Sequence, residues 1–177
     1  MNKILLPILL LATTFLFRAR AQKASASPGP DHSAHTEHAQ GVDERGDKGM
    51  GFSHELTGHH FYLFPDGGGI EVEALDPKDA KSKEAIRTHL NMIAGMFAEG
   101  NFSIPMFVHK MAPPGVEKLK QLKKEITYTA ENTPGGAQVR ITTKNFEAIK
   151  AIHDFLRFQI EAHRTGDSME VKPPRRS

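Results

Sequence analysis

A strand–turn–strand–helix pattern that occurs twice is the strongest constraint on how this chain folds. Residues 61–64 and 70–74 are β-prone runs on either side of a Pro- and Gly-rich turn, and residues 126–129 and 139–142 flank a second such turn. Two ββα units that pair their hairpins bury both helices against one sheet. We therefore expect an α+β domain: a four-stranded antiparallel sheet with the helices packed on one face.

Apolar residues at helical spacing place one helix after each hairpin. The first helix is expected to begin near Pro77, to be capped by Asp79 or Ser82, and to end at Gly100. Its buried stripe is expected to consist of Ile86, Leu90, Ile93 and Phe97. Asn145 is the expected cap of the second helix. The buried stripe of that helix is expected to consist of Phe146, Ile149, Leu156 and Ile160.

The segment between the two units, residues 101–124, is strongly apolar at its start. Pro105 and Pro113 exclude a long helix there, whereas residues 115–122 have the length of two helical turns. We expect the apolar part to pack as a cover over the core. The alternative is that it lines a pocket or the interface of a homodimer.

The N-terminus is typical of an export signal. Lys3 precedes an apolar run over residues 4–17, and residues 19–21 read Ala-Arg-Ala, which fits a signal-peptidase site. Residues 1–21 are therefore predicted to be a signal peptide, and the mature protein is expected to be periplasmic or secreted. Arg18 and Arg20 leave an uncleaved anchor as the alternative.

The mature chain is predicted to have three parts. Residues 22–49 are polar and His-rich and are expected to be disordered, residues 50–167 form the α+β domain, and residues 168–177 form a disordered tail. Removal of the signal takes away three basic residues, leaving 20 (23 − 3) against 21 acidic ones, and the formal charge becomes −1. This charge gives no basis for binding nucleic acid, and we expect no membrane association after cleavage.

The chain has 10 histidines, 7 methionines and no cysteine. An exported protein without thiols binds a soft or borderline metal through imidazole and thioether groups, so copper is the first expectation, with zinc or haem as alternatives. The predicted ligands in the domain are His59, His60, His89, His109, His153, Met92, Met96 and Met106. The tract His32, His35 and His38 is expected to chelate divalent ions weakly, without a fold.

Spacing limits which of these residues can meet. Because neighbours on a strand point to opposite faces, only one of His59 and His60 can face the core. His89, Met92 and Met96 lie on one side of the first helix, where filling of the core is the simpler interpretation for the methionines. His153 occupies a corresponding place on the second helix, so helices lying side by side would bring His89 and His153 together.

Several strings in the domain resemble a family of small exported bacterial proteins of uncharacterised function. They lie at residues 50–52, 57–61, 67–72, 86–90, 113–116 and 151–167. Members often carry the label aspartate carbamoyltransferase, but this chain has neither an S-T-R-T loop nor an H-P-x-Q string, so that activity is not expected. The family often has a histidine where this chain has Met92, and the resemblance therefore implies a softer site here.

Together these features predict a periplasmic metal-binding protein that sequesters, senses or delivers copper. The alternatives are a haem or small-ligand binding protein, a histidine- or metal-dependent enzyme that uses the same pocket, and an interaction module with incidental histidines. The chain has no nucleophile elbow, H-E-x-x-H motif, P-loop or dinucleotide fingerprint, and so no motif predicts an enzyme.

Overall fold

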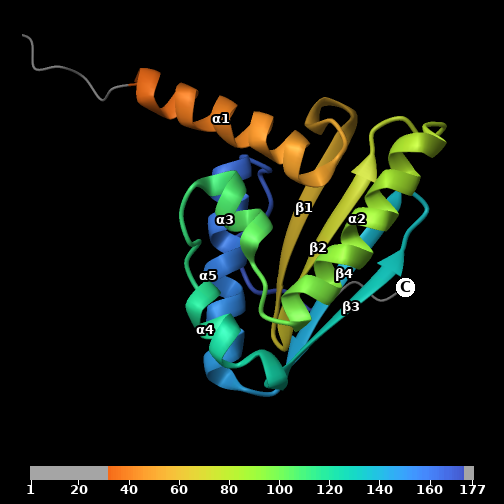
Figure 1. Ribbon diagram of the computed structural model, residues 1–177. Coiled ribbons are helices and arrows are strands. Elements are labelled where there is room, and N and C mark those ends of the chain that lie inside the picture. The colour runs from red at the N-terminus through yellow and green to blue at the C-terminus, as the bar shows by residue number, and fades with distance from the viewer. Residues whose placement is uncertain (1–31, 174–177) are drawn as a thin grey trace, which may run out of the picture. The chain divides into compact units, whose positions relative to one another are not determined.

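The computed structural model describes residues 32–173, with side chains from residue 41 onward, and confirms the predicted α+β fold (Figure 1). The strands are β1 (Thr57–Phe64), β2 (Gly67–Ala74), β3 (Ile126–Asn132) and β4 (Gly136–Thr143). They form one antiparallel sheet in the order β1-β2-β4-β3. The helices are α1 (His32–Met50), α2 (Ala80–Ala98), α3 (Ser103–His109), α4 (Val116–Gln121) and α5 (Phe146–His163). Short 3-10 turns, η1 (His54–Leu56) and η2 (Lys123–Glu125), precede β1 and β3.

The two ββα units join through the pairing of β2 with β4. Ile70 lies opposite Val139 in this pairing, so the two hairpins form one continuous sheet. Helix α2 lies over β3 and β4, and α5 lies over β1 and β2 on the same face. Gly68 of β2 allows this close packing, since a Cβ atom there would collide with Leu156 of α5.

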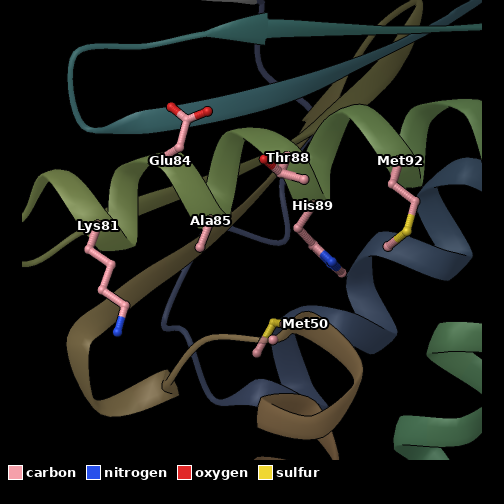
Figure 2. A pocket seen from close by; sticks show the side chains of 8 residues that line it. Met50, Lys81, Glu84, Ala85, Thr88, His89 and Met92 are labelled. Atoms are coloured by element: carbon pink, nitrogen blue, oxygen red, sulfur yellow. The ribbon is translucent and has the colours of Figure 1, made fainter.

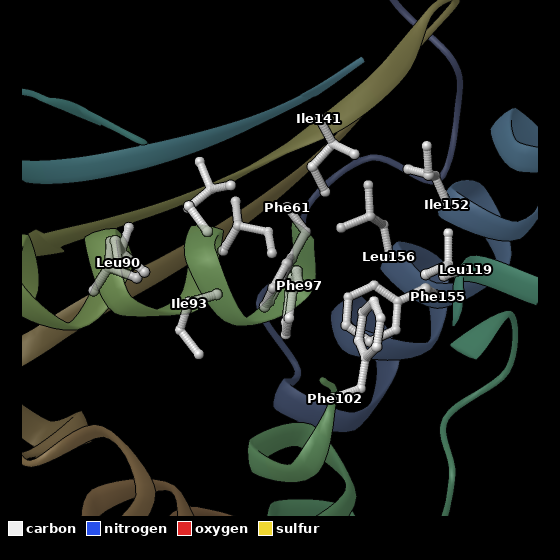
Figure 3. Close-up of a cluster of buried hydrophobic side chains, with 14 of the residues drawn as sticks. Phe61, Leu90, Ile93, Phe97, Phe102, Leu119, Ile141, Ile152, Phe155 and Leu156 are labelled. Atoms are coloured by element: carbon white, nitrogen blue, oxygen red, sulfur yellow. The ribbon is translucent and has the colours of Figure 1, made fainter. Parts of the chain in front are cut away.

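The core lies between the sheet and these helices. The stripe predicted for α2 is buried as expected, and Phe97 at its end stacks on Phe102 with ring centroids 4.4 Å apart (Figure 3). The apolar segment after α2 packs against the core as predicted, but it does so as helix α3. Pro105 is accommodated there because it lies in the first turn, where no N–H is needed for the helix.

The N-terminal caps predicted for α2 and α5 are both observed. The Asp79 side chain accepts a hydrogen bond from the Ser82 backbone N–H, and the Asn145 side chain accepts from the N–H groups of Glu147 and Ala148. The prediction that Phe146 is buried is wrong, because its side chain is 85% exposed at the first position of α5. The buried stripe of α5 begins at Ala148, and Ile149 of the predicted stripe is only half-buried, whereas Leu156 and Ile160 are buried as predicted.

The packed unit starts earlier than the predicted boundary near residue 50. Helix α1 covers the second half of the segment expected to be disordered: Val42 is fully buried, and the Arg45 side chain donates to the Val108 carbonyl at 2.6 Å. Helix α1 packs on α3, where Gly49 lies beside Ile104. The predicted signal peptide, and the side chains of residues 32–40, lie outside the described part of the chain.

The C-terminal segment also differs from the predicted free tail. The Lys172 N–H donates to the Leu63 carbonyl at 2.9 Å, and Arg157 donates to the carbonyl of Met169, whose side chain packs against the core. Residues 168–173 therefore lie along the outer edge of β1. Among residues 32–173, no helix is both long and apolar enough to cross a lipid bilayer.

Two glycine-to-alanine substitutions are expected to change stability in opposite directions. Gly68→Ala overpacks the contact with Leu156 and should lower the free energy of unfolding by about 1–3 kcal/mol. Gly95→Ala lies on the exposed side of α2 with no atom within 4 Å of the new Cβ, so it should raise stability by about 0.5–1 kcal/mol. Urea denaturation of both variants measures the two effects, and equal effects would contradict the packing described for β2 and α5.

Candidate functional site

Four histidines from four elements line one cavity. They are His59 of β1, His89 of α2, His109 of α3 and His163 at the end of α5, and we call the space the histidine cavity. Its volume is about 80 Å³, and its other walls are mostly apolar. Among the described residues that line it, none is Asp, Glu, Lys or Arg.

The end of α1 and the segment after it close the cavity on one side. Met50, the last residue of α1, places its Sδ atom 3.0 Å from Nε2 of His59. Phe52 stacks on His59 at a centroid distance of 6.3 Å and meets the ring of His89 edge-on at 5.6 Å. His59 and His89 therefore share an apolar cover.

The remaining histidines continue from His59 as a row of contacts. The rings of His59 and His163 stack with centroids 6.0 Å apart, and His163 meets His109 almost perpendicularly at 5.2 Å. His109 Nε2 lies 3.0 Å from Oε1 of Gln159, and we assign the proton to this nitrogen because the amide oxygen can only accept. Gln159 and His163 face the same way because they are four residues apart on α5.

Two buried polar atoms at the histidine cavity have no hydrogen-bond partner among the described residues. These atoms are Nδ1 of His89 and the amide Nε2 of Gln159. Their side chains are 7% and 4% exposed. A buried polar group without a partner costs free energy, so this pair indicates a cavity that accommodates a polar guest or an ion.

Burial also determines the charge of these histidines. It lowers the pKa of His89 to about 4, and burial together with neighbouring imidazoles lowers the pKa of His59 to about 4 and that of His163 to about 3. All three are neutral at pH 7. A neutral imidazole keeps a lone pair that can bind a metal ion.

His60 and His153 do not line the histidine cavity. His60 is on the opposite face of the sheet, as strand alternation requires, and its Nδ1 lies 3.1 Å from Asp167 Oδ1. His153 donates from Nε2 to the carbonyls of Phe64 and Gly67, at 2.9 and 3.0 Å, and so holds the turn between β1 and β2. The expected approach of His153 to His89 is not observed.

The three predicted methionine ligands also lie outside this cavity. Met92 is 46% exposed and lines a surface hollow, Met96 packs against the core, and the Sδ atom of Met106 lies 3.9 Å from Lys120 Nζ. In the part of the chain that the structure describes, no three His, Asp or Glu side chains form a ready metal-binding cluster. The side chains of His32, His35 and His38 lie outside the described residues.

Two residues of the site, His163 and Met50, were not among the predicted ligands. His163 extends the apolar stripe of α5, since it follows Leu156 and Ile160 at helical spacing. That spacing was a usable signal in the sequence. Met50 had no such signal in the sequence, because it reaches the cavity only through the packing of α1 on the domain.

The buried histidines make stability dependent on pH. Below their ordinary pKa of 6.5 the unfolded chain takes up protons at His59, His89 and His163, whereas the folded chain does so only near pH 4 or below. The free energy of unfolding should therefore fall as the pH drops from 6.5 to 4, by up to about 1.4 kcal/mol per pH unit for a fully buried histidine. Urea denaturation at several pH values tests this. His89→Leu should reduce the slope, and an unchanged slope in that variant would contradict the assignment.

The chain matches no family model, no curated protein and no solved structure. The resemblance to small exported proteins therefore stays a prediction.

Proposed function

We propose that the histidine cavity binds a single copper(I) ion, with Met50, His59 and His89 as its main ligands and His163 within the same cavity. The observation that carries this proposal is the convergence of a thioether and neutral imidazoles on one uncharged cavity, where Met50 Sδ and His59 Nε2 are 3.0 Å apart. Thioether and imidazole groups suit copper(I). The protein would hold this ion for sequestration or delivery outside the cytoplasm.

The absence of charge among the described lining residues favours a monovalent ion over a divalent one. The cost of moving an ion out of water rises with the square of its charge, and anionic ligands usually compensate that cost. No carboxylate is among the described residues lining this cavity. Zinc(II) would therefore be bound less favourably here than copper(I).

The size of the cavity disfavours the haem and small-ligand alternatives. Sites for drug-sized ligands have volumes of roughly 300–1,000 Å³, whereas this cavity has about 80 Å³. An ion or a few water molecules fit such a space. Haem needs a far larger volume than this cavity offers.

Ion binding requires a modest adjustment of the ligands, since their present arrangement is not a closed triad. Met50 suits this adjustment because its side chain has three rotatable bonds and an adaptable thioether. It also ends α1 and precedes Gly51, which has a φ of +79°. The end of the helix can therefore reorient without strain on a side chain at residue 51.

Anaerobic titration with copper(I) against a competing chelator tests the proposal. His32, His35 and His38 should first be replaced with alanine, so that weak chelation by this N-terminal histidine tract does not contribute to the measured binding. We expect one copper(I) ion per chain, and His59→Gln should weaken binding by about tenfold or more, because loss of even an outer-shell partner costs that much.

His60→Gln is the matched control, since it alters the next residue of β1 on the opposite face of the sheet. It should leave the affinity unchanged. Equal affinities in the His59→Gln and His60→Gln variants would overturn the proposal, provided that circular dichroism shows both to be folded. Stronger retention of zinc(II) than of copper(I) would also overturn it.

A further inference from the structure

A second cavity at the surface adjoins the histidine cavity. This outer hollow lies between the end of α1 and the first turns of α2, has a volume of about 550 Å³, and is shown in Figure 2. Its lining includes Met50, Lys81, Glu84, His89 and Met92. Met50 and His89 line both spaces, so these two side chains form the wall that the outer hollow and the histidine cavity share.

Met92 gives the outer hollow a soft ligand of its own. It follows His89 by three residues on α2, and Figure 2 shows both side chains leaving the helix on the same side, with Met50 facing them. Its side chain is 46% exposed, so it does not serve to fill the core. Met92, His89 and Met50 thus present a thioether, an imidazole and a thioether to the outer hollow, and His89 is the most deeply buried of the three.

We infer that the outer hollow is the route by which the ion enters and leaves, and that Met92 is its outer, transient ligand. This inference rests on the proposed function of the histidine cavity. A bare ion in an apolar passage would be strongly destabilised, so exchange requires that each ligand is replaced by the next before it is released. The buried Nδ1 of His89, which has no partner among the described residues, supplies an acceptor at the shared wall.

A rival route exists on the other side of the cavity. A hollow of about 170 Å³ shares Met50, His59 and His163 with the histidine cavity, and Asp43 and His54 also line it. Each hollow has one carboxylate in its lining, Asp43 here and Glu84 in the outer hollow, but the sulfur donor of this second hollow is Met50, which is already a ligand in the proposed inner site. The outer hollow has the additional thioether and is therefore the better path for a soft ion.

The kinetics of copper(I) exchange distinguish the routes. The full chain should be loaded with one copper(I) ion, and both its uptake and its removal by bathocuproine disulfonate followed by stopped-flow absorbance under anaerobic conditions. Met92→Leu should slow uptake and removal by the same factor, roughly threefold or more, because a transient ligand lowers the barrier in both directions. The dissociation constant should therefore remain unchanged.

Met111→Leu is the matched control. Met111 is 50% exposed, a fraction similar to the 46% of Met92, but it does not line the outer hollow. This variant should exchange copper(I) at the rate of the unmodified chain.

Three results would overturn the inference. Unchanged rates in Met92→Leu show that the ion does not pass Met92. A larger dissociation constant with faster release in Met92→Leu shows that Met92 is a permanent ligand. Exchange that is slowed in His54→Gln but not in Met92→Leu shows that the ion uses the rival route. Failure of the unmodified chain to bind copper(I) would instead refute the proposed function, so the two failures are separable.

Discussion

The contact of three phenylalanine rings holds the site together. Phe97 of α2 stacks on Phe102, which directly precedes α3, and both meet Phe155 of α5 edge-on at about 6 Å. These three helices also carry His89, His109 and His163, so the ring cluster fixes the distances among the histidines. Aromatic pairs of this kind add roughly 0.5–1.5 kcal/mol each beyond the area they bury. The positions of these histidines thus depend on the hydrophobic core rather than on contacts within the cavity.

The same burial produces the chemical character of the cavity. Because apolar walls surround the imidazoles, their pKa values fall and they remain neutral, and a site without charge selects ions by softness rather than by attraction. Helix α1 completes this environment, since Met50 and the following Phe52 cover His59 and His89. The fold and the proposed preference for copper(I) therefore have one physical origin.

Local patterns predicted most of the fold and part of the site. The hairpins, the cap at Asn145 and the stripe of α2 depend on short-range chemistry, and strand alternation correctly separated His59 from His60. Helix α1 was not predictable because its polar, glycine-containing sequence has low helix propensity, and tertiary packing of Val42 and Arg45 stabilises it. The structural role of His153 was not predictable, because the carbonyls that accept its hydrogen bond lie 86 and 89 residues away in the sequence.

Hydrogen-bond partners, rather than burial or composition, separate the histidines proposed as ligands from those with a structural role. His89 and His153 are almost equally buried, at 7% and 8% exposure. The Nε2 of His153 is shared between two backbone carbonyls, which gives that side chain a complete structural explanation. Nδ1 of His89 has no such partner among the described residues, and His89 lines two cavities. A fold retains a costly group of this kind most readily when a ligand supplies the missing contact, and His89 is therefore included among the proposed ligands.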